Sequence, residues 1–387
     1  MRVGGGNGRF GVDLRIISAG AAQGVVCAHA ADHGDRVEGS FGAVGAMLER
    51  FRAGDAADLV ILTHAQITDL ASRSEVVPGT AADLGAVPTS IAVRAGEKIP
   101  GVASAESLRE ALLAADAIYF PDPARATAGI HFAKVLDELG IRAQVADRVR
   151  NFPNGATAMR AMSGAGGHPI GCTQSTEILA TPGVALVAPL PRGLDLETVY
   201  TAAVHAQAKQ REGAAAFVRD LTGEGARARR TAAGFGGFAI RPATRADHEA
   251  VRAVVASVLG EYAIPADPAD ADSDLADIDR SYGEGGAFDV VTAADGRIVG
   301  SCGVLRLDAD ACELKKMYLL REARGAGLGR RLLQRAIAFA RGTGYTRIEL
   351  TTASVLANAI AMYRRQGFTP IARVIPSRCD QAYALAL

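Results

Sequence analysis

A glycine-rich turn at residues 324–329 constrains this chain more than any other stretch. The apolar run 312–320 before it predicts a strand, and residues 330–340 after it carry apolar side chains at helical spacing. Glycines leave backbone N–H groups unshielded, and a helix start adds positive potential. The sequence therefore predicts a strand, a turn and a helix arranged to hold a diphosphate.

The spacing of this turn differs from two other phosphate-binding turns. No Gly-Lys-Ser/Thr follows it, which excludes a P-loop. Arg324, Gly327 and Gly329 give Arg-x-x-Gly-x-Gly, with an arginine in the leading position where a dinucleotide-binding turn has glycine. With the strand before it, the pattern resembles motif A of the GNAT family of N-acetyltransferases, which implies acetyl-CoA as cofactor.

The resemblance also implies which residues hold the cofactor. Exposed backbone on a strand that splays from its neighbour pairs with the pantetheine amides, and the glycine turn holds the pyrophosphate. The implied cofactor-binding residues are Met317, Tyr318, Leu319, Arg324, Gly325, Gly327, Leu328, Gly329 and Asn358.

Residues 358–368, Asn-Ala-Ile-Ala-Met-Tyr-Arg-Arg-Gln-Gly-Phe, resemble the closing motif of the same family. The resemblance implies that Asn358 contacts the cofactor arm and that Tyr363 is the general acid for the thiolate; the alternative is that Tyr363 is a half-buried core residue. Because Asn358 and Tyr363 are five positions apart on a helix, their side chains point about 140° apart. One ligand can contact both only if it extends past the start of the helix. For the base that deprotonates the amine, Glu313 is the first candidate and Glu349 the second; the alternative for Glu313 is a surface position.

Composition bounds the remaining possibilities. With 387 residues, two or three compact units are expected. Hydrophobic residues make up 49% and charged residues 22%, which is typical of a globular protein. Lys plus Arg and Asp plus Glu both number 42, so nothing points to nucleic acid or an anionic membrane as partner.

The cysteines and the N-terminus indicate a cytoplasmic location. Five scattered cysteines without a Cys-x-x-Cys predict neither a disulfide framework nor a zinc site, and no metal is expected. Residues 1–12 lack the apolar segment of a signal peptide, and no apolar run is long enough for a membrane helix.

Strands and helices alternate in the first part of the chain. Short apolar runs at 12–18, 36–41 and 57–63 predict strands, with helices between them up to about residue 33 and over 45–53. Such alternation predicts a parallel sheet with ligands at the strands' carboxyl ends. Further strands are predicted at 117–120, 169–172 and 184–187, and helices at 197–210 and 214–221.

Residues 40–45, 51–62 and 122–129 are similar in order and spacing to periplasmic molybdate-binding proteins. Over residues 12–233 the resemblance implies a type 2 solute-binding fold, an α/β domain of two lobes joined by crossover strands with a ligand cleft between them. Ala21, and Ala43 with Val44, stand where that family carries oxyanion-binding hydroxyls, and Gln174 replaces a tyrosine, which argues against molybdate.

Other hydrogen-bonding groups remain for a small anion or an organic acid. Backbone N–H groups at Gly42 and Gly45 could contribute. The alternative is that the hydroxyl, amide and backbone groups of these candidate cleft residues are ordinary strand-end and capping groups. The candidate cleft residues are Ser18, Ser40, Gly42, Thr63, Thr127, Thr173, Gln174 and Ser175.

A second domain is predicted over 238–387, after a glycine-containing linker at 234–237. Strand 238–242 and the helix over 247–260 look like the opening of a GNAT domain, whose sheet is mixed, mostly antiparallel and splayed. Residues 265–279 carry six aspartates. These predict either a solvated loop with helix caps or a surface that attracts a cationic amine.

The expected protein is therefore an N-acetyltransferase fused to a small-molecule binding or sensing module. Its acceptor is an amine on a small molecule or a peptide, and an oligomer is possible. One alternative is a solute-binding protein with a degenerate acetyltransferase domain. Another is a small-carboxylate isomerase in the first domain, because aconitate isomerase resembles the same solute-binding family.

Overall fold

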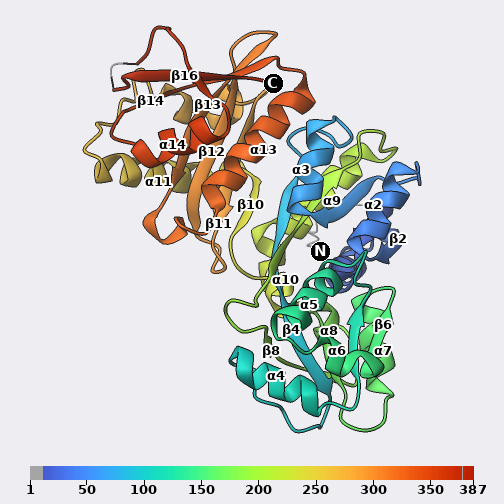
Figure 1. The fold of residues 1–387 in the computed structure, drawn as a ribbon. Helices are drawn as coiled ribbons and strands as arrows, with labels where there is room; N and C mark the ends of the chain where they lie inside the picture. The colour runs from blue at the N-terminus through green and yellow to red at the C-terminus, as the bar shows by residue number, and fades with distance from the viewer. Residues whose placement is uncertain (1–11, 377) are drawn as a thin grey trace, which may run out of the picture. The chain divides into compact units, whose positions relative to one another are not determined.

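The computed structural model describes residues 12–376 and 378–387, which form two compact units (Figure 1). The first unit contains the chain up to His64 together with Leu84–Gly236, and the second contains Ala65–Asp83 together with Gly237–Leu387. The cut after Gly236 falls inside the predicted linker. Residues 1–11, for which no signal peptide is expected, lie outside the described residues.

The first unit is built on one sheet whose strands form two groups. Its order is β2-β1-β3-β9-β4-β7-β5-β6, and β8 pairs with β4. The bounds are β1 (Asp13–Ala19), β2 (Arg36–Gly42), β3 (Leu59–Thr63), β4 (Ala82–Arg94), β5 (Ile118–Pro121), β6 (Val149–Phe152), β7 (Ile170–Gln174), β8 (Val184–Pro189) and β9 (Glu197–Val204).

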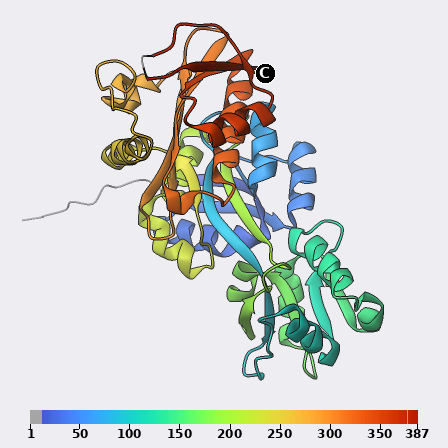
Figure 2. The same ribbon diagram turned by 60° about the vertical axis from the view of Figure 1, so that its left-hand side comes forward.

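The two groups are the two lobes expected from the sequence. In one lobe β1 is parallel to β2 and to β3, and in the other β5 is parallel to β6 and to β7. β9 and β4 are the middle strands, and the long β4 runs between the lobes (Figure 2). The expected two-lobed α/β fold is confirmed.

Helices follow the strands of both lobes. In the first lobe these are α1 (Gln23–His33), α2 (Val44–Arg52), α9 (Arg211–Thr222) and α10 (Arg227–Ala232), whose arginines contact α1 and α9. In the other lobe they are α4 (Ala105–Ala114), α5 (Thr127–Glu138), α6 (Arg142–Val145), α7 (Gly155–Ser163) and α8 (Ser175–Leu179).

The predicted helix at 197–210 is wrong. Residues 197–204 form β9, which pairs antiparallel with β3 from Leu59 opposite Val204 to Thr63 opposite Tyr200. Its β-branched and aromatic side chains suit a buried strand, and their packing outweighs the helix preference of the alanines nearby.

The second unit contains a mixed sheet of seven strands in the order β10-β11-β12-β13-β14-β16-β15. Among the described strands of this unit, only β13 and β14 pair in parallel, and their register ends at Glu313 opposite Glu349. Beyond that pair the strands separate, which confirms the expected splayed, mostly antiparallel sheet. The strands are β10 (Ala239–Pro242), β11 (Ala287–Thr292), β12 (Ile298–Arg306), β13 (Ala311–Leu319), β14 (Arg347–Thr352), β15 (Thr369–Pro370) and β16 (Gln381–Ala386).

Strand β13 is irregular just after it leaves β14. Lys316 has a φ of 52°, which is unusual for a residue other than glycine, and the register with β12 shifts between Ser301 and Gly303. The Ser301 hydroxyl donates to the Lys316 carbonyl over 2.7 Å and holds this bulge. The helices of the unit are α11 (His248–Glu261), α12 (Ile278–Ser281), α13 (Leu328–Thr343) and α14 (Ala357–Arg365).

Residues 65–83 are part of the second unit although they lie early in the sequence. The segment contains most of α3 (His64–Ser72) and ends at Asp83, whose buried carboxylate accepts the Ile240 N–H over 2.8 Å and pairs with Arg331. A Cβ added to Gly342 of α13 would lie 2.4 Å from the Ala71 carbonyl oxygen. This packing was not predicted, because the sequence boundaries place 65–83 within the first domain.

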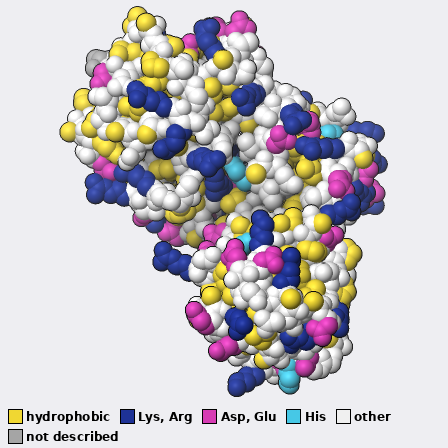
Figure 3. All heavy atoms as spheres, in the orientation of Figure 1, with side chains coloured by type: hydrophobic (Ala, Val, Ile, Leu, Met, Phe, Trp, Pro, Cys, Tyr) yellow, Lys and Arg dark blue, Asp and Glu magenta, His cyan; other side chains and the backbone are white. Residues whose placement is uncertain are grey.

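The surface and the interior show few other special features in the described part of the chain. None of its helices is long and apolar enough to cross a membrane, and no group of three or more His, Cys, Asp or Glu could hold a metal ion. On the face shown in Figure 3, acidic and basic side chains are interspersed, in keeping with their equal numbers.

Candidate active site

A cavity of about 800 Å³ lies in the second unit. Its walls come from the splayed end of β13, the glycine turn, the first turn of α13, the end of β14, and α14. Apart from Glu349, the second candidate base, every residue that the sequence predicts for cofactor binding or catalysis lines this cavity: Glu313, Met317, Tyr318, Leu319, Arg324, Gly325, Gly327, Leu328, Gly329, Asn358 and Tyr363.

The glycine turn forms an open cradle at the start of α13. Gly325 and Gly327 have φ values of 82° and 75°, in the region that favours glycine. A Cβ added at either position would meet no atom within 4 Å. The first turn of α13 has no acidic residue and no side-chain cap, so its N–H groups are available to an anion. These residues fit the diphosphate of acetyl-CoA.

Arg324 lies beside the cradle and is held by the protein. Its Nε donates to the Leu319 carbonyl over 2.8 Å, and its Nη1 lies 2.9 Å from Glu261 Oε2. Hydrogen bonds from Arg324 and Arg321 lower the pKa of Glu261. Arg324 therefore ties the splayed end of β13 to α11, and its contact with a phosphate stays a prediction.

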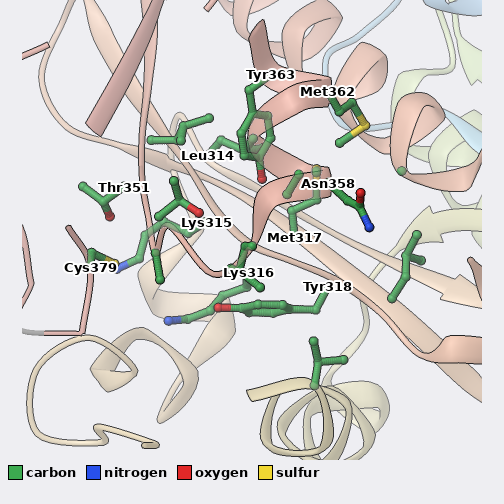
Figure 4. Close-up of a pocket in the computed structure, with 18 of the residues that line it drawn as sticks. Leu314, Lys315, Lys316, Met317, Tyr318, Thr351, Asn358, Met362, Tyr363 and Cys379 are labelled. Atoms are coloured by element: carbon green, nitrogen blue, oxygen red, sulfur yellow. The ribbon is translucent and has the colours of Figure 1, made fainter. Parts of the chain in front are cut away.

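Tyr363 of α14 places its hydroxyl in the cavity. The side chain is buried and packs against Phe368, with ring centroids 5.8 Å apart. Burial, with smaller contributions from Cys302 and Tyr318, raises the pKa of Tyr363, so the phenol keeps its proton at neutral pH. Figure 4 shows its hydroxyl pointing toward β13, while the Asn358 amide points away from it, as their spacing predicts.

Both predicted bases contact the same arginine. Arg373 Nη1 lies 3.5 Å from a Glu313 oxygen and 2.8 Å from a Glu349 oxygen, and the Thr351 hydroxyl donates to Glu313 over 3.4 Å. Glu313 lines the cavity and Glu349 does not. The geometry therefore favours Glu313 as the group that meets an acceptor amine.

The acidic segment does not present free carboxylates to the cavity. Asp272 is buried and binds two cations, the Lys316 ammonium at 2.8 Å and the Arg378 guanidinium at 2.5 Å. Asp274 lies 3.1 Å from the same ammonium, and Asp277 caps α12 by accepting the Arg280 N–H. Asp277 fits the predicted helix cap, whereas Asp272 and Asp274 are buried in ion pairs and fit neither a solvated loop nor a surface that attracts a cationic amine.

The Lys316–Asp272–Arg378 cluster holds the bulge of β13 in place. Burial raises the pKa of Asp272, but hydrogen bonds from Arg378 and the Asp267 N–H, and the Lys316 ammonium, outweigh burial and lower it to about 2. A carboxylate whose pKa is lower in the folded state stabilises the protein above its unfolded pKa of about 4. That stability is lost as pH falls toward 2.

Replacing Asp272 by asparagine should therefore lower the free energy of unfolding by about 3 kcal/mol, because it leaves Lys316 buried without its full counter-charge. Guanidinium denaturation at pH 7 measures the change. The control is Asp270→Asn, at an exposed position of the same segment, with an expected change within about 0.5 kcal/mol. Equal effects of the two changes would contradict a special role for Asp272.

The first unit contains a much smaller cavity, of about 20 Å³. Strand ends and helix starts from both lobes line it, and of the predicted cleft residues it includes Gly42, Thr127 and Gln174. Glu177 and Tyr200 also line it and were not predicted from the sequence. Glu177 could have been found from its place in the sequence. It is an acidic residue in the first turn after a strand that ends at Gln174, and ligands bind at the carboxyl ends of such strands.

Residues 18–236 match the family described as bacterial extracellular solute-binding protein, and residues 253–368 match the acetyltransferase (GNAT) family. The uncharacterised N-acetyltransferase YjgM of Escherichia coli is 36% identical over 137 residues, covering 34% of this chain and 82% of the relative. The chain belongs to both families. Its first part is a solute-binding domain and its second a GNAT domain.

Two other relatives match the solute-binding domain. The aconitate isomerase of a Pseudomonas species is 23% identical over 182 residues, covering 47% of this chain and 68% of that protein. The periplasmic molybdate-binding protein of Azotobacter vinelandii is 18% identical with a TM-score of 0.48, covering 57% of this chain and 98% of that structure.

Five residues predicted for the cleft of the solute-binding domain do not line its cavity: Ser18, Ser40, Thr63, Thr173 and Ser175. For three of these the protein supplies the acceptor. The Ser18 hydroxyl donates to the Ala19 carbonyl over 2.9 Å, Thr173 donates to Glu177 over 2.5 Å, and Ser175 donates to the Gly234 carbonyl over 3.4 Å.

Proposed function

We propose that the chain is an acetyl-CoA-dependent N-acetyltransferase fused to a small-molecule binding domain. One observation carries the proposal: the glycine cradle, the bulged and splayed β13, and the buried Tyr363 hydroxyl all face one cavity of about 800 Å³. Membership of the GNAT family supports acyl transfer in general. The choice of acetyl-CoA and of an amine acceptor belongs to the proposal.

The cofactor would be held along the edge of β13 and at the start of α13. Backbone N–H groups around Gly325 and Gly327 would bind the diphosphate, and the backbone of Met317 to Leu319, beyond the point where β13 leaves β14, would pair with the pantetheine amides. When bound, acetyl-CoA supplies an acetyl group activated as a thioester. Asn358, at the start of α14, would contact the cofactor arm.

Three groups of the chain would then serve acetyl transfer to the amine. Glu313 removes a proton from the ammonium form of the acceptor, which frees the lone pair of the nitrogen. The Leu319 N–H is the proposed donor that polarises the thioester carbonyl. As the C–N bond forms and the C–S bond breaks, Tyr363 would give its proton to the departing sulfur, and the second proton of the nitrogen would return to the phenolate, so that the products are an amide and a neutral thiol.

Thiol release tests the proposal. The full chain, acetyl-CoA and a panel of primary amines should release free coenzyme A, detected with a disulfide dye, only when a suitable amine is present. Mass spectrometry of the amine should show the added acetyl group. Calorimetry that shows no acetyl-CoA binding would instead support a degenerate GNAT domain.

Two further points concern the setting of the reaction. We propose a cytoplasmic location, because none of the cysteines of the chain is paired, as in reducing compartments. The solute-binding domain implies a small-molecule ligand, and the family resemblance adds a small anion or an organic acid as the first expectation for it.

Replacing Glu313 by glutamine should lower kcat about 100-fold at pH 7, because no group then takes the amine proton. The loss should shrink as pH rises toward the pKa of the amine, about 10, since the free amine then needs no base. Rates measured from pH 6 to 10 check this. The comparison is Glu349→Gln, which keeps the cavity wall intact and should change kcat by less than about threefold. A larger loss with Glu349→Gln than with Glu313→Gln would reverse the assignment.

A further inference from the structure

Several of the hydrogen-bond donors that the sequence offers for an anion in the cleft of the solute-binding domain are already in use. The Gly45 N–H, which the sequence offers as an anion donor, donates instead to the Arg125 carbonyl of the other lobe over 3.2 Å. The Thr173 and Ser18 hydroxyls also donate within the domain. Buried anions need matched donors, and these three groups are not available as such.

An acceptor, in contrast, is left without a partner. Gln174 is 3% exposed and lines the cavity. Its Nε2 donates to the Thr198 hydroxyl over 3.3 Å, while its Oε1 accepts no hydrogen bond from any described residue. Leaving a buried acceptor unsatisfied is unfavourable, so a ligand that donates to it would gain binding free energy.

Glu177 places a carboxyl group at the same position. The side chain is 7% exposed, and the two glycines beside it leave room for its carboxylate. A Cβ added to Gly20 would lie 2.9 Å from Oε1, and one added to Gly155 would lie 2.0 Å from Oε2. The carboxylate therefore occupies the start of α7, where an external anion would otherwise gain the field of the helix.

No counter-ion accompanies this carboxylate. Among the described residues that line the cavity there is no lysine, arginine or histidine. Burial raises the pKa of Glu177, and the Thr173 hydroxyl and the N–H groups of Ala156, Gln174 and Gly155 oppose this rise. Neutral donors alone thus face the carboxylate, and a cationic ligand would supply the missing charge.

We propose that this cleft binds the ammonium group of a small primary amine, with Glu177 as counter-charge and Gln174 Oε1 as acceptor. A cavity of about 20 Å³ holds one water-sized group, which matches an ammonium head and not a four-oxygen oxyanion. The rest of the amine extends toward solvent. This inference stands independently of the proposed catalysis, although an N-acetyltransferase consumes the same chemical class.

Calorimetric titration of the full chain, without acetyl-CoA, tests the proposal. The probes are methylammonium chloride, sodium molybdate and sodium sulfate at constant ionic strength. Methylammonium should bind in a saturable 1:1 manner, and neither oxyanion should bind. Oxyanion binding without methylammonium binding would overturn the proposal, and so would the absence of both.

Two variants locate the bound amine. Glu177→Gln and Gln174→Leu should each weaken methylammonium binding at least tenfold, while Glu138→Gln, an exposed position on α5, should leave it unchanged. Circular dichroism identifies a variant that fails to fold, in which case the other variant and the wild-type titrations decide. Methylammonium binding that survives both cleft changes would place the amine elsewhere and overturn the proposal.

Discussion

Replacing Gly327 by valine should weaken acetyl-CoA binding at least about 100-fold, or about 2.7 kcal/mol. Gly327 is the N-cap of α13 with a φ of 75°, and the space beside its Cα is open. Valine adds two methyl groups in the space proposed for the diphosphate, and a β-branched residue resists this conformation. Calorimetry with acetyl-CoA measures the loss.

The opposite end of the same helix provides the control. Gly344 caps α13 with a φ of 97°, has open space around it, and does not line the cavity. Because both glycines have a positive φ, Gly344→Val and Gly327→Val should each lower the free energy of unfolding by about 1–2 kcal/mol. Gly344→Val should leave the affinity for acetyl-CoA unchanged. If both variants lose affinity equally, backbone strain and not the cradle explains the effect.

The candidate site of the GNAT domain could be predicted from the sequence because its parts are local. The turn 324–329 and the helix over 357–365 each carry their chemistry within one short stretch, and the conformation of each follows from its glycines and its periodicity. The predicted residues consequently lie around one cavity. Their roles stay predictions.

Interactions between distant residues could not be predicted in the same way. Asp272 pairs with Lys316 and Arg378, 44 and 106 positions away, and no local pattern marks these partners. The packing of residues 65–83 into the second unit likewise depends on contacts such as Asp83 with Arg331. The acidic segment therefore suggested an attractive surface, whereas several of its charges are already matched.

The cleft of the solute-binding domain shows the same limit in its hydrogen bonds. A hydroxyl at a strand end can serve a ligand or a nearby carbonyl, and the sequence does not distinguish the two. Thr173 donates to a glutamate four residues on, and Gly45 donates to Arg125 in the other lobe. The sequence located the cleft and predicted a small anion for it, whereas the ammonium site proposed above has the opposite sign.

Replacing Tyr363 by phenylalanine should lower kcat about 100-fold with little change in the KM for acetyl-CoA. The ring is buried against Phe368, so phenylalanine keeps the packing and removes only the hydroxyl. Without that proton donor the sulfur must leave as a thiolate, which affects the transition state and not binding. Steady-state rates over a range of acetyl-CoA concentrations separate the two parameters.

Tyr345→Phe is the matched control for this change. Tyr345 is buried in the same hydrophobic core, its hydroxyl donates to the Gly285 carbonyl over 2.6 Å, and it lies outside the cavity. Loss of this hydrogen bond should lower the free energy of unfolding by about 1 kcal/mol and leave kcat unchanged. Equal kcat values for Tyr363→Phe and wild type would show that the sulfur departs without this acid, and the buried phenol would then be a core residue whose hydroxyl happens to face the cavity.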